Sequence, residues 1–143
     1  KLGGAFFLSL EGDGSTDKAQ ISQEAGVVRY VDGKTKLPAE QFLGLNNLQD
    51  EKADGVYNGL HDILKLYGLS EEAIKSVLIC FNLDGTSVNM GDNDSVKTRA
   101  KQDIAQTIVN HCVNHALELV VSVGAKGHTV IENAISTITD VFL

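Results

Sequence analysis

The sequence predicts an α/β domain built around a mixed β-sheet. Three observations carry this prediction: strand-like segments with an Asp-Gly turn signal near the start, an amphipathic helix followed by a further apolar strand, and apolar helical patterns toward the end. With 143 residues and 43% hydrophobic content, the chain is long enough to bury one apolar core. We therefore expect a single domain over residues 1–143.

The first third of the chain predicts a meander of three strands. Residues 5–10 (AFFLSL) form a short apolar run that is typical of a strand buried on both faces, and the turn-rich sequence EGDGSTD ends it. Residues 26–31 (GVVRYV) precede the dipeptide DG, a strong hairpin signal. Residues 37–45 supply a third strand, and Pro38 places it at a sheet edge because proline cannot donate to a ladder.

A strand, helix and strand pattern follows the meander. Asp54 can cap a helix whose apolar side chains recur at helical spacing, and Gly68 ends it. A short helical turn over residues 70–75 leads into a buried strand over residues 77–81 (VLICF), which runs into the loop NLDGTSVNMGDND. A helix between two strands implies a parallel crossover.

The last third predicts a polar helical stretch over residues 95–106, a brief strand over residues 107–109, and two apolar helices. An opening meander argues against an all-parallel doubly wound fold and favours a mixed sheet. This order of elements is the ribonuclease-H-like topology, in which the first strand lies beside the fourth. Asp13 and Asp84, each expected just past the end of one of those strands, should therefore face each other.

Asp13 and Asp84 are the candidate catalytic and metal-binding residues. Phosphodiester chemistry with two metals needs carboxylates at the ends of neighbouring strands, which clamp cations ~4 Å apart. An Asp beside a Gly after a strand is also ordinary turn chemistry, so that alternative stays open. Asp17 is similarly ambiguous, since it can simply cap or close the loop.

Two other site types share these loops. The segment ICFNLDGTS resembles the DxDGT signature of haloacid-dehalogenase-type phosphatases, but Asn82 replaces the nucleophilic Asp, and an amide cannot form an aspartyl-phosphate. A phosphatase-like enzyme is therefore the weakest alternative. An EF-hand loop starting at Glu11 would need Gly at its sixth position, where Thr16 stands.

The segment HCVNH carries further candidate ligands. Cys112 and His115 are three residues apart and would share a helical face, but a closed zinc site needs four ligands and the sequence offers no second pair. A packed thiol and a hydrogen-bonded His111 are the favoured roles. Cys80 and Cys112 are expected to be free thiols, which suits a reducing compartment.

The charge balance bears on the partners. A net charge of −7 repels a phosphate backbone, so a grip on DNA must come mostly from other parts of the protein. Acidic balance is compatible with a metal-dependent nuclease, because bound cations neutralise the carboxylates. Lys97, Arg99 and Lys101 form a small basic patch, for which a solvated helix face is the default. The sequence has neither a run of ~18 apolar residues nor a signal-peptide pattern, so no membrane partner is expected.

Several segments resemble, in order and spacing, the first half of the catalytic domain of hAT-superfamily transposases, including transposon-derived zinc-finger and cellular proteins. They are FFLSLEGDGSTD, VVRYVDG, FLGL, ICFNLDGTSVNMG, VKTRAK and NHCVNHALEL, and they span nearly the whole chain. The resemblance implies that Asp13 and Asp84 are the first two catalytic aspartates and that Cys112 and His115 form the C-x-x-H motif of the family. The third acid of the family is a Glu on a later helix, beyond a helical insertion; Glu132 precedes that insertion and is not assigned.

The resemblance implies an intact parent protein that uses Mg²⁺ or Mn²⁺ to cut and transfer DNA strands in the nucleus, with room for a homo-oligomer. We expect this chain to be the N-terminal part of a longer catalytic domain and to be inactive by itself, since the third acid is absent from it. The alternative is a domesticated, non-catalytic scaffold in a zinc-finger protein, which contacts DNA or protein. The acidic charge favours it, as does Ala116, where relatives often carry a basic residue.

Overall fold

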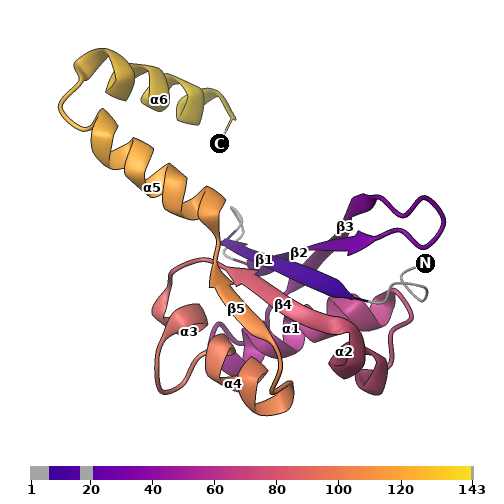
Figure 1. The fold of residues 1–143 in the computed structure, drawn as a ribbon. Coiled ribbons are helices and arrows are strands. Elements are labelled where there is room, and N and C mark those ends of the chain that lie inside the picture. Colours follow the sequence, from indigo (N-terminus) through magenta and orange to yellow (C-terminus); the bar gives the residue numbers. More distant parts are fainter. Residues whose placement is uncertain (1–6, 17–20, 143) are drawn as a thin grey trace. The chain divides into compact units, whose positions relative to one another are not determined.

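The computed structural model describes residues 7–16 and 21–142, and it contains a five-stranded mixed sheet with helices (Figure 1). The strands are β1 (Leu8–Thr16), β2 (Ser22–Val31), β3 (Pro38–Asn47), β4 (Leu78–Leu83) and β5 (Ile108–His111). The helices are α1 (Ala53–Leu66), α2 (Glu71–Val77), α3 (Ser87–Met90), α4 (Val96–Asp103), α5 (Val113–Ala125) and α6 (Thr129–Phe142). The predicted mixed α/β class with a ribonuclease-like arrangement is confirmed.

The sheet has an antiparallel half and a parallel half. Its strand order is β3-β2-β1-β4-β5; β1 pairs antiparallel with β2, and β2 antiparallel with β3. On the other side β1 pairs parallel with β4, and β4 parallel with β5. The first strand therefore lies beside the fourth, as the element order predicts, and the strand that begins at Pro38 lies at the edge.

The first strand is longer than the sequence predicts. It runs to Thr16 and pairs with β2 along its whole described length, with Asp13 opposite Ala25. The expectation that EGDGSTD breaks the strand is therefore wrong, because an extended partner strand supplies ladder hydrogen bonds that stabilise even a glycine-rich stretch. Asp13 lies inside β1 and not beyond its end. Asp17 lies outside the described residues.

The helix ends also differ in detail. The N-cap of α1 is Lys52 and makes no side-chain cap bond, so Asp54 is not the cap; it stands in the first turn, where a carboxylate suits the helix dipole. Gly68 follows that helix with φ +86°, which confirms the predicted stop. The polar helix is shorter than expected, and Ser95 caps it through a capping box with Thr98. The short α3 was not predicted.

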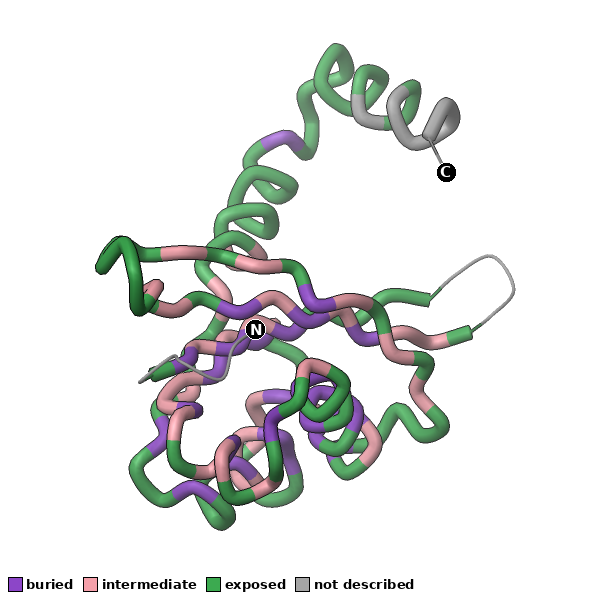
Figure 2. Tube along the Cα trace, turned by 90° about the vertical axis from the view of Figure 1, so that its right-hand side faces the viewer, coloured by how far each residue is buried: buried purple, intermediate pink, exposed green. Residues whose placement is uncertain are grey.

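The core fills the space between the sheet and the helices α1, α2 and α4, which lie on one face of it (Figures 1 and 2). The apolar stripe of α1 supplies Leu60, Ile63 and Leu64, all fully buried. Each such side chain stabilises the fold by roughly 1.5–3 kcal/mol relative to exposure. The strands, the remaining helices and Ile104, which directly follows α4, contribute the other fully buried apolar residues. Those of the strands and helices are Leu8, Leu10, Val28, Ile74, Leu78, Phe81, Leu83, Val96 and Ala100.

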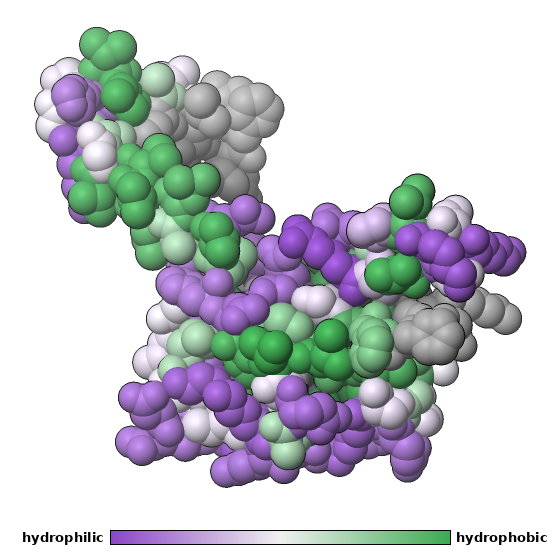
Figure 3. Space-filling view, in the orientation of Figure 1, coloured by the Kyte–Doolittle hydropathy of each residue, from purple (hydrophilic) through white to green (hydrophobic). Residues whose placement is uncertain are grey.

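The chain forms two compact units, residues 1–112 and residues 113–143. The second unit consists of α5 and α6, and apolar side chains gather on α5, where Leu117, Val120 and Val121 are exposed (Figure 3). Within residues 7–16 and 21–142, no helix combines the length and the apolar character that crossing a membrane requires. That residues 1–143 make up a single domain stays a prediction.

Candidate functional site

The parallel pair of β1 and β4 sets the positions of Asp13 and Asp84. Glu11 is level with Asn82 in the register, and Asn82 Nδ2 donates to Ser9 Oγ at 2.9 Å across the two strands. Asp13 and Asp84 each follow two residues later in the chain, Asp13 within β1 and Asp84 directly after β4. Because the two strands run in the same direction, both residues lie toward the same end of the sheet. Their role in catalysis or metal binding stays a prediction.

Asp13 belongs to one face of β1. Side chains alternate along a strand, so Asp13 shares its face with Glu11, opposite the face that α1 covers. Glu11 lies 3.7 Å from Arg29 Nη2, and the thiol of Cys112 donates to Glu11 Oε1 at 3.5 Å. Asp13 itself is exposed. This face therefore holds two carboxylates, with a cation and a thiol beside the first of them.

Asp84 is held in place by the turn that follows β4. Its Oδ1 accepts hydrogen bonds from Thr86 N at 3.0 Å, Thr86 Oγ1 at 2.7 Å and Asn89 Nδ2 at 2.8 Å. A Cβ atom on Gly85 would stand 2.6 Å from Nε2 of His111, so any other residue at this position requires that ring to shift. The turn chemistry is therefore present, and it fixes the orientation of the carboxylate.

Glu24 is a further acidic residue that the sequence reading missed. It lies on β2, on the same face of the strand as the buried positions Gly26 and Val28. Only 2% of its surface is exposed. Two glycines of β1 make room for it. A Cβ on Gly12 would stand 2.7 Å from Glu24 Oε1, and one on Gly14 would stand 3.1 Å from Oε2. The GDG sequence thus accommodates a buried carboxyl group.

Burial raises the pKa of Glu24 from its usual 4.5 to about 7, and the negative charges of Asp13 and Asp84 add to the effect. Glu24 is therefore close enough to both aspartates to feel their charge, although it lies on the other face of the sheet from Asp13. The alternation along β2 could have revealed it. Glu24 stands two residues before Gly26 and four before Val28, so it shares their buried face. A strand that starts at Gly26, as predicted, leaves that signal out.

Glu24 and Asp84 line one cavity of about 320 Å³. Its other lining residues are mostly small or polar, namely Gly14, Ser15, Thr16, Ser22, Gln23, Leu48, Glu51, Val56, Thr86, Val88 and Asn89. Among residues 7–16 and 21–142, no three His, Cys, Asp or Glu side chains are close enough to hold a metal ion. The charges of Asp13 and Asp84 thus act on Glu24, but the three residues do not form a three-carboxylate metal centre in this structure.

The HCVNH segment is divided between the two units. Cys112 ends the strand region of the first unit, where its N–H donates to the Leu83 carbonyl at 2.6 Å, and α5 begins one residue later. The expectation that Cys112 and His115 share a helical face is therefore wrong, because Cys112 is not in the helix. His115 lies 3.9 Å from Glu118 within α5, and both cysteines are free thiols.

Glu132 has a local structural role in the second unit. Its Oε1 accepts the N–H of Gly127 at 3.1 Å, at the turn before α6. Gly127 has φ +87°, so the turn requires a residue that tolerates the left-handed region. The hydrogen bond explains Glu132 without a catalytic role.

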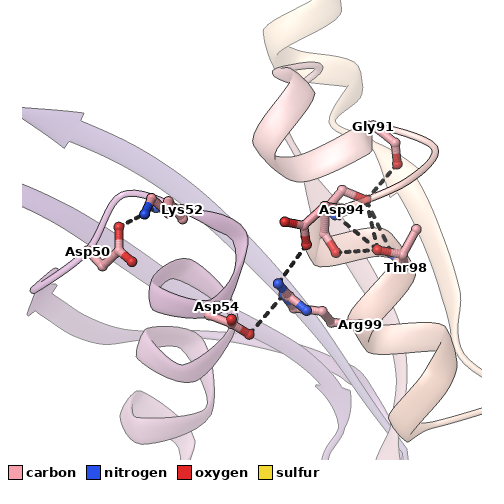
Figure 4. A network of polar contacts seen from close by, with 8 residues as sticks. Asp50, Lys52, Asp54, Gly91, Asp94, Thr98 and Arg99 are labelled. Atoms are coloured by element: carbon pink, nitrogen blue, oxygen red, sulfur yellow. Dashed lines mark hydrogen bonds and ion pairs between the residues drawn. The ribbon is translucent and has the colours of Figure 1, made fainter.

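The predicted basic patch is largely neutralised. Arg99 lies 3.0 Å from Asp54 and 2.6 Å from Asp94, and so ties α1 to the loop before α4 (Figure 4). Lys97 lies 2.9 Å from Asp92. These pairs support the solvated-helix alternative over a phosphate contact.

The comparisons with known proteins place this geometry in a family. No curated protein matches the chain. The family model described as "DUF4371: ZMYM1/FAM200, RNase-like domain" matches residues 1–94, which include Asp13, Glu24 and Asp84. That match spans more than half of the sequence and carries the sheet through β4 and α3. The chain belongs to this transposase-derived family of RNase-like domains.

Proposed function

We propose that this chain is part of the catalytic domain of a hAT-type transposase, whose intact parent protein cuts and transfers DNA strands with the help of Mg²⁺ or Mn²⁺. The observation that carries the proposal is the arrangement of Asp13 and Asp84 at the same end of two adjacent parallel strands. This is the placement that two-metal phosphodiester chemistry uses. Membership in an RNase-like family supports it.

The donor atoms fit a hard divalent cation. Carboxylate oxygens are the ligands that Mg²⁺ prefers, and Asp84 is oriented by Thr86 and Asn89, as ligands often are by the groups behind them. When bound, the cation would activate water or a DNA 3′-hydroxyl and stabilise charge on the reacting phosphate. Asp13 and Asp84 would hold it, and a Glu from a later helix of the parent would complete the set. Two carboxylates alone would hold metal loosely, so this chain by itself should not cut DNA.

The proposed partner is DNA, reached through the parent protein in the nucleus. The net charge of −7 and the pairing of Arg99 and Lys97 with acids leave this chain little attraction for phosphate. Other parts of the parent, such as a zinc finger or a second copy of the protein, would therefore supply most of the binding energy.

Nicking of supercoiled DNA by the full-length parent tests the proposal. With Mg²⁺ or Mn²⁺ present, we expect the Asp84→Asn variant to nick about 100-fold more slowly or worse, since even groups behind metal ligands cost 10–100-fold. Asp92→Asn is the matched control, because Asp92 is an exposed acid of the same loop region and pairs with the surface residue Lys97. Equal nicking by the wild type and Asp84→Asn would remove Asp84 from the mechanism.

The second candidate function is a domesticated scaffold that contacts DNA or protein without cutting DNA. The neutralised basic patch and Ala116, at the position where the resembling transposases often carry a basic residue, favour it. The same experiment separates the two functions. A wild-type parent that binds DNA but nicks it no faster than the Asp84→Asn variant would support the scaffold.

A further inference from the structure

Helix α5 has an apolar face that takes up more than half of its circumference. At about 100° per residue, its Val and Leu positions fall on one wide arc. The polar positions share the remaining arc; they are Asn114, His115, Glu118 and Ser122. The Val and Leu side chains are half exposed or more (Figure 3), namely Val113, Leu117, Leu119, Val120, Val121 and Val123. A helix that is apolar this far round is ordinarily buried in a core.

The second unit does not bury this face by itself. The cavity that α5 and α6 both line lies on the polar side of α5, and its lining residues are Ser122, Ala125, Lys126, Glu132 and Ser136. Ala125, at that cavity, is the buried residue of α5. The unit of residues 113–143 is also shorter than the roughly 40 residues below which chains usually need oligomerisation or another staple to be stable. The apolar face of α5 is thus left for a surface outside this unit.

The chemistry of the face makes a second copy of it the best match. Contact about a two-fold axis sets the same patch of each copy against the other. A patch that carries charge repels its own copy, whereas a patch that is apolar throughout matches it. The only charged residue of α5 is Glu118, and it stands on the polar side of the helix. The apolar face therefore holds nothing that would oppose contact with itself.

The ends of α5 favour an antiparallel arrangement of two copies. The helix has no acidic residue in its first turn and no basic residue in its last turn, so its own side chains do not offset the helix dipole. In an antiparallel pair the start of each helix lies beside the end of the other. The two dipoles then offset each other, which a parallel pair would not achieve.

We propose that the apolar face of α5 binds the same face of a second copy of this chain, with the two helices antiparallel. The six Val and Leu side chains present on the order of 100 Å² each, so two copies would bury roughly 1,000 Å². This area reaches the lower limit for a specific protein interface. The contact uses neither Asp13 nor Asp84, so it extends beyond the proposed strand cleavage and does not rest on it.

Sedimentation equilibrium of the 143-residue chain tests the proposal. We expect a monomer–dimer equilibrium that is populated at concentrations on the order of 100 µM and stops at the dimer. Leu117→Glu and Val120→Glu should each weaken dimerisation by at least about tenfold, because each sets a carboxylate in the apolar contact. Asn114→Glu adds the same charge on the polar side of the same helix, and it should dimerise within about twofold of the wild type.

Hydrogen exchange locates the contact. Exchange of the α5 amides should slow as the wild-type concentration rises, and in Val120→Glu it should not depend on concentration. Circular dichroism checks that the variants keep their helices, and Val120→Ser replaces Val120→Glu if the carboxylate unfolds α5.

Three results would overturn the proposal. The first is a wild-type chain that stays monomeric at this concentration, including one whose α5 amides are protected at every dilution, since the face would then be covered within one chain. The second is growth beyond the dimer into open-ended aggregates. The third is dimerisation of both Leu117→Glu and the Val120 variant to the same extent as the wild type.

Discussion

The two faces of β1 place acidic side chains in very different surroundings. On one face Asp13 is exposed and stands next in the alternation to Glu11, which contacts Arg29. On the other face the bare backbone of Gly12 lies against the buried carboxyl group of Glu24, whose pKa burial raises to about 7. The comparison teaches that one short GDG sequence provides both an accessible carboxylate and the space for an enclosed one. The negative charge of Asp84, at the end of the adjacent strand, adds to the rise in the pKa of Glu24.

The largest expected effect concerns the enclosed carboxyl. Because the pKa of Glu24 is higher in the folded protein than its usual 4.5, the folded state holds the extra proton between pH 4.5 and about 7, and stability falls as pH rises through that window. The Glu24→Gln variant should lack this loss. Between pH 4 and pH 8 the free energy of unfolding of the wild type should therefore fall by about 3 kcal/mol more than that of the variant. Urea unfolding in a chelator at both pH values measures it, and identical pH dependence in the two proteins would contradict the account.

Much of this comparison could be predicted from the sequence, but only on the exposed side. Period-2 and helical patterns, together with Pro38, sufficed for the strand order and for the neighbouring positions of β1 and β4, because those signals are local. Glu24 was missed because its burial depends on parts of the chain that are distant in sequence. These are Gly12 on the paired strand β1 and the helix α1 that covers this face of the sheet. Local signals also misplaced Asp13, since a glycine-rich turn pattern cannot report that a partner strand extends it.

A smaller effect is expected from closing the space on β1. Gly12→Ala should destabilise the chain by about 2 kcal/mol, because the new Cβ would meet Glu24 Oε1 at 2.7 Å and side chains of the core near 3 Å. Gly124→Ala, in α5, has nothing within 4 Å and should be neutral or slightly stabilising. Denaturant midpoints compare the two. Equal stability of Gly12→Ala and wild type would show that Glu24 is not confined as described.

The turn on the other side of Asp84 should be less sensitive. Gly85→Ala would place a Cβ 2.6 Å from the His111 ring, but that ring belongs to an exposed residue and can shift, so we expect a loss of only about 1 kcal/mol. In His111→Ala, the same substitution at Gly85 should cost almost nothing. A double-mutant cycle on thermal unfolding measures the difference, and additive effects would rule out the contact.

The smallest effect belongs to the ion pairs of the polar helix. Lys97→Ala removes one pair with the exposed Asp92, and surface pairs contribute at most about 1 kcal/mol. We expect the free energy of unfolding to change by no more than a few tenths of a kcal/mol, and DNA binding by the parent to stay the same. A fall in DNA affinity together with a weaker salt dependence would instead identify Lys97 as a phosphate contact.

The central claim is that Asp13 and Asp84 act as one site because their strands are parallel neighbours. The most direct test is a double-mutant cycle on Mn²⁺-dependent DNA nicking by the full-length parent, with Asp13→Asn, Asp84→Asn and the pair. If both carboxylates hold the same cations, losing either one already removes the function of the pair. The double variant should therefore nick about as slowly as the slower single variant. Losses that multiply in the double variant would mean that the two carboxylates act independently.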